Sequence, residues 1–138
     1  MKNCINVKHA SLNLKGLHHI AIICSDYDKS KKFYTEILGF TTLGETFRKE
    51  RGSYKLDLIL GPIRIELFSF PNPPRRITFP EATGLRHIAF VVNKIDKLVK
   101  KITLLGVSVE PVRIDLTTGK KFTFLFDPDF LPIEIYEK

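Results

Sequence analysis

Apolar and polar positions follow a pattern that occurs twice along the chain. Residues 17–24 and 85–92 form apolar runs of strand length. After each run, apolar residues recur at helical spacing, and the helical stretch ends at a glycine, Gly39 or Gly106. Three shorter strand-like segments follow in each half, at 41–47, 54–60 and 63–68 and at 108–114, 122–126 and 133–136. The pattern predicts an α+β fold of two βαβββ modules in tandem.

The two halves are also related residue by residue. A shift of 68 positions places His19-Ile20-Ala21 on His87-Ile88-Ala89 and Ile65-Glu66 on Ile133-Glu134. Twice this offset nearly spans the 138 residues, which indicates a duplicated module rather than a solenoid. We therefore expect an N-terminal extension (1–16), a first module (17–70), a proline-rich linker (71–84) and a second module (85–138).

Capping and turn residues fit these boundaries. Ser25, Asp26 and Asp28 offer N-caps for the first helix, and Asp96 offers one for the second. The last two strands of each module are separated by good turn sequences, Gly61-Pro62 and Asp127-Pro128-Asp129.

The repeat pairs two histidines and two glutamates, His19 with His87 and Glu66 with Glu134. Side chains alternate between the two faces of a strand, so each module places one histidine on its first strand and one glutamate on its last. Both glutamates interrupt apolar strands, where a carboxylate is costly unless it is paired or bound to a cation. His18, which is Arg86 in the second copy, is assigned to the opposite face.

Two imidazoles and two carboxylates form a ligand set suited to Zn²⁺, Ni²⁺, Co²⁺, Mn²⁺ or Fe²⁺. A single strand histidine or glutamate is more often an ordinary hydrogen-bonded or solvated residue. Four such residues at matched positions of a duplicated module favour the metal site, because pseudo-twofold symmetry allows all four to meet at one point.

The formal net charge of +7 narrows the choice of partners. Lysines and arginines are spread along the chain without a nucleic-acid-binding motif, so we expect a small anionic substrate and no nucleic acid. Arg113 and Lys120 are the candidate substrate contacts. Phe122, Phe124 and Phe126 share one strand face, either as core or as a substrate wall.

Two further features bear on the cellular setting. No apolar run is long enough to cross a bilayer, so we expect no membrane partner. Cys4 and Cys24 are the only cysteines, and we expect a reduced, cytoplasmic protein in which Cys24 is a small buried residue.

The segments HHIAIICSDYDKSKKFYTEILGF, RHIAFVVNKIDKLVKKITLLGV, IELF and FTFLFDPDFLPIEIYEK carry a family resemblance. Over residues 17–137 the chain resembles the vicinal oxygen chelate superfamily, and specifically its glyoxalase I (lactoylglutathione lyase) branch. The resemblance implies one domain in which paired βαβββ modules form an eight-stranded, cup-shaped mixed sheet around a divalent metal. Its ligands would be His19, Glu66, His87 and Glu134.

The resemblance also implies a chemistry. Family enzymes chelate neighbouring oxygens of a substrate, and a metal-bound glutamate serves as the base in proton transfer. We favour Glu134 as the main base, with Glu66 as its symmetric partner. A homodimer is expected, with the cup closed either within one chain or by exchange of modules between two chains.

Three positions depart from the glyoxalase I pattern. The family tends to place an arginine four residues after the first metal histidine and an asparagine four residues after the first metal glutamate, and both help to hold glutathione. Here these positions are Ile23 and Phe70. The glycine that usually follows the D-P-D turn is Phe130, so the turn is expected to adjust, because phenylalanine tolerates positive φ poorly.

Several functions remain open at this point. The first is a metal-dependent lyase or isomerase of glyoxalase I type, acting on a thiol adduct other than that of glutathione. The second is an epimerase or a thiol transferase of the same superfamily. An extradiol dioxygenase usually has a longer chain, and a non-catalytic binding module would have no need of costly internal carboxylates.

Overall fold

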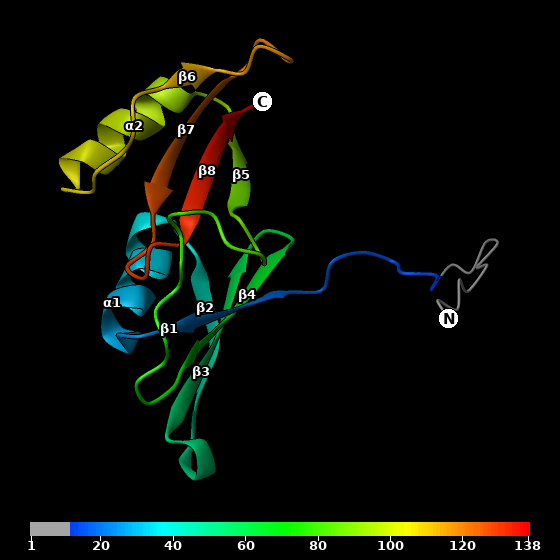
Figure 1. The fold of residues 1–138 in the computed structure, drawn as a ribbon, viewed down its shortest axis with the longest axis vertical. Helices are drawn as coiled ribbons and strands as arrows, with labels where there is room; N and C mark the ends of the chain where they lie inside the picture. Colours follow the sequence, from blue (N-terminus) through cyan, green and yellow to red (C-terminus); the bar gives the residue numbers. More distant parts are fainter. Residues whose placement is uncertain (1–11) are drawn as a thin grey trace.

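The computed structural model describes residues 12–138, and the first eleven residues, including Cys4, lie outside the described part. The predicted pair of βαβββ modules is confirmed (Figure 1). Among residues 12–138, no helix is long and apolar enough to cross a membrane. The first module contains β1 (Ile20–Cys24), α1 (Tyr27–Lys32) with a π-helical turn (Phe33–Ile37), β2 (Thr41–Arg48), a 3-10 turn (Lys49–Arg51), β3 (Ser53–Leu60) and β4 (Ile63–Ser69).

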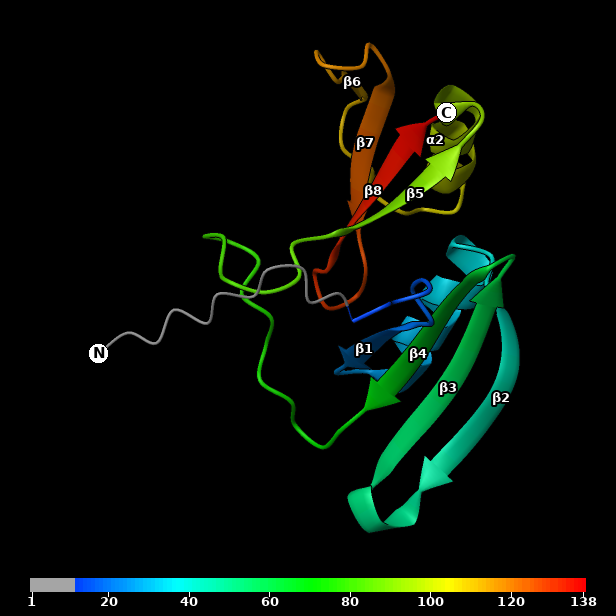
Figure 2. The ribbon, with the colours of Figure 1, turned by 90° about the vertical axis from the view of Figure 1, so that its right-hand side faces the viewer.

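The second module repeats this order. It contains β5 (Ile88–Val92), α2 (Ile95–Leu104), β6 (Arg113–Ile114), β7 (Lys121–Phe126) and β8 (Pro132–Glu137). The eight strands form two separate four-stranded sheets, with the orders β1-β4-β3-β2 and β5-β8-β7-β6. Figures 1 and 2 show the two sheets one above the other along the long axis of the molecule.

Strand register is duplicated together with the sequence. In both modules the first strand pairs in parallel with the last, and Ala21 lies opposite Glu66 as Ala89 lies opposite Glu134. Each alanine is two residues beyond a candidate histidine and therefore on the same face as that histidine. The register thus brings one histidine and one glutamate together in each module.

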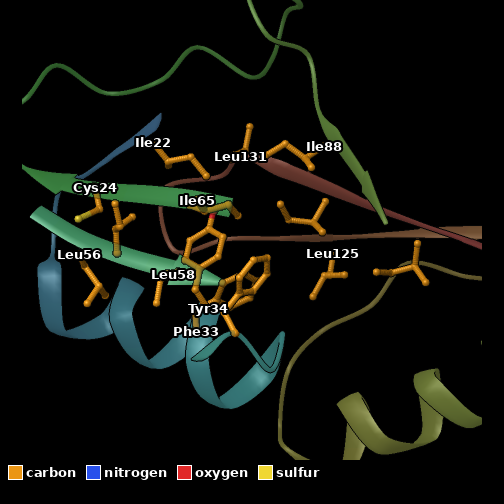
Figure 3. Packing of buried hydrophobic residues seen from close by; sticks show 14 of the residues in the cluster. Ile22, Cys24, Phe33, Tyr34, Leu56, Leu58, Ile65, Ile88, Leu125 and Leu131 are labelled. Atoms are coloured by element: carbon orange, nitrogen blue, oxygen red, sulfur yellow. The ribbon is translucent and has the colours of Figure 1, made fainter. Parts of the chain in front are cut away.

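One apolar cluster joins the modules. Leu56, Leu58 and Ile65 are buried in the first module, and Leu125 and Ile133 are buried at matching places in the second. Figure 3 shows the ring of Tyr34 among first-module side chains, with Leu131 of the second module nearby. The faces opposite this core remain available for the candidate site.

The turn between β7 and β8 also binds the first module. The hydroxyl of Tyr34 donates to Oδ2 of Asp127 over 2.8 Å, and both residues are buried. The backbone N–H of Ser25 donates to Asp129 over 2.9 Å, and the Ser25 hydroxyl donates to the same carboxylate. This turn is therefore a polar joint between the two modules.

Three local predictions differ from the structure: the cap of α2, the length of the strand at 108–114 and the turn at Phe130. Asp26 caps α1 by accepting from Lys29 N–H over 3.1 Å, as expected. The prediction that Asp96 caps α2 is wrong, because Lys94 is the N-cap residue and Glu137 of β8 accepts from Ile95 N–H over 3.0 Å. A tertiary contact thus replaces the local cap.

The strand expected at 108–114 shortens to the two-residue β6. Pro111 lies within that run and cannot donate to a sheet ladder. The turn at Phe130 was expected to adjust so as to avoid positive φ, and this was also wrong, since Phe130 itself adopts φ 64°. The turn keeps its left-handed residue although the glycine is absent.

Candidate metal and substrate site

The first half of the candidate site consists of His19, the residue before β1, and Glu66 of β4. His19 Nε2 is 3.5 Å from Glu66 Oε2. The ring of His18 reaches this half as well, with its Nδ1 2.8 Å from Nδ1 of His19. When Nε2 of His19 offers its lone pair to a cation, its Nδ1 carries the proton and donates to His18. In that tautomer His18 orients the imidazole, a role that its predicted place on the opposite face did not suggest.

The second half consists of His87, the residue before β5, and Glu134 of β8. His87 Nε2 is 3.1 Å from Glu134 Oε2, and both side chains are only partly exposed. Nδ1 of His87 is buried and has no hydrogen-bond partner within residues 12–138. A buried imidazole nitrogen without a partner is costly, so this half gains from a group supplied by a ligand or a second chain.

The two pairs have the spacing of metal ligands. Two donor atoms that are each about 2.1 Å from one ion, at octahedral or tetrahedral angles, stand about 3.0–3.4 Å apart. The separation of 3.1 Å in the second pair lies within this range, and that of 3.5 Å in the first pair lies slightly above it. Within the described residues, however, no three His, Cys, Asp or Glu side chains gather as one metal-binding group. The chain therefore presents two separate pairs of one histidine and one glutamate, called half-sites below.

The halves differ in what surrounds the glutamate. In the first, Asp57 of β3 lies opposite Glu66, and Lys55 donates to Asp57 over 2.8 Å and contacts Glu66 Oε1 at 3.1 Å. These two acids raise the pKa of the Lys55 ammonium, Asp57 most strongly. At the corresponding register positions of β7 stand Phe122 and Phe124. The β3 neighbours of Glu66 are thus charged, whereas the β7 neighbours of Glu134 are aromatic.

A cavity of about 200 Å³ adjoins the second half. His87 lines it together with Phe124 and Phe126, and the linker contributes a wall that includes Phe79. Phe122, Phe124 and Phe126 are half-buried on the sheet face that carries Glu134, rather than in the core. Two of the three phenylalanines therefore line this cavity.

Arg113, a predicted substrate contact, also lines this cavity. Its guanidinium lies 5.0 Å from the ring centroid of Phe122 and 5.7 Å from that of Phe124. One of its N–H groups donates to Glu110 over 2.9 Å. Lys120, the other predicted contact, directs its ammonium to the backbone carbonyl of Lys138 over 3.0 Å and is not among the lining residues.

The remaining candidates are placed as follows. Cys24 is 1% exposed, and burial raises the pKa of its thiol to about 11, so it is a packed side chain and a poor nucleophile. Ile23, at the arginine position of the glyoxalase I pattern, is 56% exposed on the face of His19. Phe70, at the asparagine position, stacks near Phe68, and the Arg48 guanidinium lies over both rings.

Sequence reasoning missed Lys55 and Asp57. The signal that could have found them is strand parity: both alternate with the apolar residues Leu56 and Leu58, and a β3–β4 hairpin at Gly61-Pro62 sets them beside Glu66. They have no counterpart in the second copy, so a search based on the repeat passes over them.

Comparison with known proteins gives a family and close relatives. The family profile described as Glyoxalase/Bleomycin resistance protein/Dioxygenase superfamily matches residues 16–135. The uncharacterized protein YwkD of Bacillus subtilis is 62% identical over 91% of this chain and 98% of its own length. The uncharacterized protein YaeR of Escherichia coli is 54% identical over 92% and 99%.

Solved structures share the fold. A glyoxalase family protein from Enterococcus faecalis is 47% identical, covers 89% of this chain and 98% of its own, and superposes with a TM-score of 0.84. The fosfomycin resistance protein FosX of Listeria monocytogenes, in a mutant form complexed with Mn(II), is 22% identical with a TM-score of 0.71. It covers 89% of this chain and 92% of its own, and it shows a common fold alone.

Proposed function

Because the chain belongs to the Glyoxalase/Bleomycin resistance protein/Dioxygenase superfamily, we propose that it is a divalent-metal-dependent lyase of the glyoxalase I type. The substrate would be a small anionic carbonyl compound, such as the hemithioacetal of a thiol. The observation that supports this most is the duplicated register, which sets a histidine beside a glutamate in each module at 3.5 and 3.1 Å.

The metal would be held by His19, Glu66, His87 and Glu134, and Zn²⁺, Ni²⁺, Co²⁺ and Mn²⁺ all suit this nitrogen and oxygen set. FosX, which shares the fold, was solved with Mn(II), so the fold accepts such an ion. A bound divalent cation supplies Lewis-acid polarisation of a substrate carbonyl oxygen, which makes the neighbouring C–H bond more acidic.

Glu134 is the proposed base. Lys55 holds Glu66 by an ion pair of 3.1 Å, and the same register position in the second module is Phe122, so Glu134 has no corresponding lysine. Glu134 takes the proton from the carbon that bears sulfur and returns it to the adjacent carbon. The hydroxyl proton passes to the former carbonyl oxygen, so the hemithioacetal becomes a thioester with no net oxidation.

A homodimer would complete the site. Ile23 and Val91 hold equivalent places on β1 and β5, on the histidine faces, and are 56% and 67% exposed. A twofold axis that sets the first module of one chain against the second module of its partner would cover both residues and join unlike half-sites. Because the chain carries the half-sites apart, the metal would be shared between chains. A cytoplasmic location is part of this proposal, since the buried Cys24 is a free thiol.

The test begins with metal content. Freshly purified protein is expected to hold about one divalent cation per chain, because two half-sites make one complete site. His87→Ala should lose it, while Lys121→Met, which breaks the surface ion pair with Asp96, should retain it. No metal in the wild type, even after addition of Ni²⁺, Zn²⁺, Co²⁺ or Mn²⁺, would contradict the proposal.

The reaction is tested by exchange of the substrate C–H proton with deuterium from solvent. Hemithioacetals of methylglyoxal with several thiols form the panel, because Ile23 and Phe70 replace the residues of glyoxalase I that help to hold glutathione. We expect exchange with at least one thiol and its loss in Glu134→Gln. Exchange without thioester formation would point to an epimerase, and binding with neither exchange nor thioester formation to a non-catalytic module.

A further inference from the structure

The aromatic cavity beside His87 differs from its counterpart in the first module in a way that bears on the substrate. At the positions of β3 that correspond to Phe122 and Phe124, the first module has Lys55 and Asp57. The strand beside Glu134 therefore offers aromatic side chains to a ligand where the strand beside Glu66 offers charged ones.

Phe124 is a neighbour of both the candidate metal ligand His87 and the cation of Arg113. The ring of His87 meets Phe124 edge to face with centroids 5.3 Å apart, and the Arg113 guanidinium is 5.7 Å from the same ring. Both groups line one cavity. A single small molecule lying over Phe124 thus has the histidine and the arginine within reach.

Arg113 is the cation of the cavity best placed for a ligand. Arg76 donates to the backbone carbonyls of Leu85 and Arg86, so its guanidinium holds the linker against the start of β5. Arg86 pairs with Glu81 at the exposed rim. Arg113 has one N–H bound to Glu110, and a guanidinium has five N–H donors in a planar fork that matches a carboxylate.

Glu110 does not cancel the charge of the Arg113 guanidinium. The Arg113–Glu110 pair is half-exposed, with 53% and 39% of the side chains accessible, and an exposed ion pair contributes little. Stacking over Phe122 and Phe124 holds the guanidinium in place by cation–π attraction and lowers the ordering cost of binding an anion.

We propose that this cavity selects a short substrate with an anionic group at each end of a few-carbon chain. The oxygen-bearing head lies at His87 and Glu134, the chain lies over Phe124, and a distal carboxylate is bound by Arg113. A cavity of about 200 Å³ suits a molecule of this size better than a bulky tripeptide conjugate. The inference rests on the proposed function for the identity of the head and adds the class of the distal group.

Two matched probes test it. 2-Oxoglutarate has a 2-oxo acid head and a distal carboxylate, and 5-methyl-2-oxohexanoate replaces that carboxylate by an isopropyl group of similar shape. Isothermal titration of the wild type is expected to give binding of 2-oxoglutarate about tenfold tighter, the size of one charge-assisted hydrogen-bonded pair. Arg113→Met should remove the preference, whereas its affinity for the neutral-ended probe should stay within about twofold of wild type.

Matched controls separate the effect of Arg113 in this cavity from the effects of net charge and of bound metal. Arg51→Met makes the same charge change at the exposed β2–β3 turn and should keep the preference. The titrations are repeated after chelator treatment, where the preference should persist at lower affinity because it comes from Arg113. If the preference for 2-oxoglutarate persists in a protein that takes up no metal, the inference is upheld although the proposed function fails.

Three results would overturn the inference. They are equal affinity for the two probes in the wild type, a preference that survives in Arg113→Met, and no detectable binding of 2-oxoglutarate to either form of the protein. The circular dichroism spectrum of each variant is compared with that of the wild type. If Arg113→Met is misfolded, Arg113→Gln takes its place with the same expected loss.

Discussion

Tyr34 and Asp127 are 93 residues apart in sequence and are joined by a buried hydrogen bond of 2.8 Å. The bond links the helical segment of the first module to the β7–β8 turn of the second. Asp127 also accepts the backbone N–H groups of Asp129 and Leu131, over 2.9 and 2.8 Å. The carboxylate therefore organises its own turn and, through Tyr34, fixes the first module against it.

Removing the Tyr34 hydroxyl should weaken this joint. Tyr34→Phe is expected to lower the free energy of unfolding by about 1–3 kcal/mol, because Asp127 Oδ2 loses a buried donor while the ring still packs. Tyr54→Phe removes a hydroxyl from a residue that is 38% exposed and should change stability by less than about 0.5 kcal/mol. Urea unfolding followed by circular dichroism measures both. Equal effects of the two substitutions would contradict the joint.

The same joint predicts a dependence of stability on pH. Burial raises the pKa of the Asp127 carboxyl above its ordinary value of 3.8, against the lowering effect of its hydrogen bonds. The folded state then holds the proton to a higher pH than the unfolded state does. The contribution of Asp127 is therefore complete below pH 3.8 and is lost as pH rises through the raised value.

Asp127→Asn isolates this contribution. The substituted amide keeps an acceptor for the two backbone N–H groups but does not titrate, whereas Asp129, Tyr34 and Cys24 nearby are common to both proteins. The difference in free energy of unfolding, wild type minus variant, should fall as pH rises above 3.8 and then level off. Unfolding midpoints measured across this range give the difference. A difference that is flat, or that rises with pH, would show that the hydrogen bonds outweigh burial.

Phe130 offers a stabilising substitution. It adopts φ 64°, a left-handed conformation in which a Cβ atom is sterically costly. Its side chain is 65% exposed, so the ring buries little surface that could offset this cost. Phe130→Gly should raise the free energy of unfolding by about 0.5–1 kcal/mol. Phe130→Ala keeps a Cβ at the same φ and serves as the control, with no comparable gain. A gain as large in alanine would mean that the ring, not the backbone, carries the cost.

The sequence predicted the modules well because the duplication reinforces each strand with a second copy. His19 and His87, Glu66 and Glu134 then follow from parity and register together. Predictions failed where a distant residue took over a local role, as Glu137 does at the start of α2. They also failed where the copies differ. Lys55 and Asp57 have no repeat partner, and alternation alone did not show whether Phe124 faces the core or a cavity.

Whether the four candidate ligands meet within one chain or between two depends on packing contacts, and these leave little trace in one sequence. In the sequence Ile23 and Val91 look like ordinary strand residues, and only the structure shows that both are exposed at matched positions. The linker allows the four-ligand site to be completed within one chain or between two chains. The described chain keeps the pairs apart, and this supports the second arrangement as a prediction.

Complementation between two inactive variants tests that arrangement. One variant, His19→Ala with Glu66→Gln, lacks the first half-site, and the other, His87→Ala with Glu134→Gln, lacks the second. If sites form between chains, a mixed dimer has one intact site and one doubly damaged site. Each homodimer has none, because every site in it lacks one half. If sites form within a chain, no pairing restores any site.

The expected result is recovery of metal binding and C–H exchange only after the variants are unfolded and refolded together. Random pairing makes half of the dimers mixed, so about a quarter of the wild-type sites should return. Metal per chain after gel filtration gives this fraction, and co-refolding each variant with itself is the control. Affinity tags of two kinds isolate the mixed dimer, in which half of the sites should hold metal. No recovery in that purified species would place the complete site within one chain.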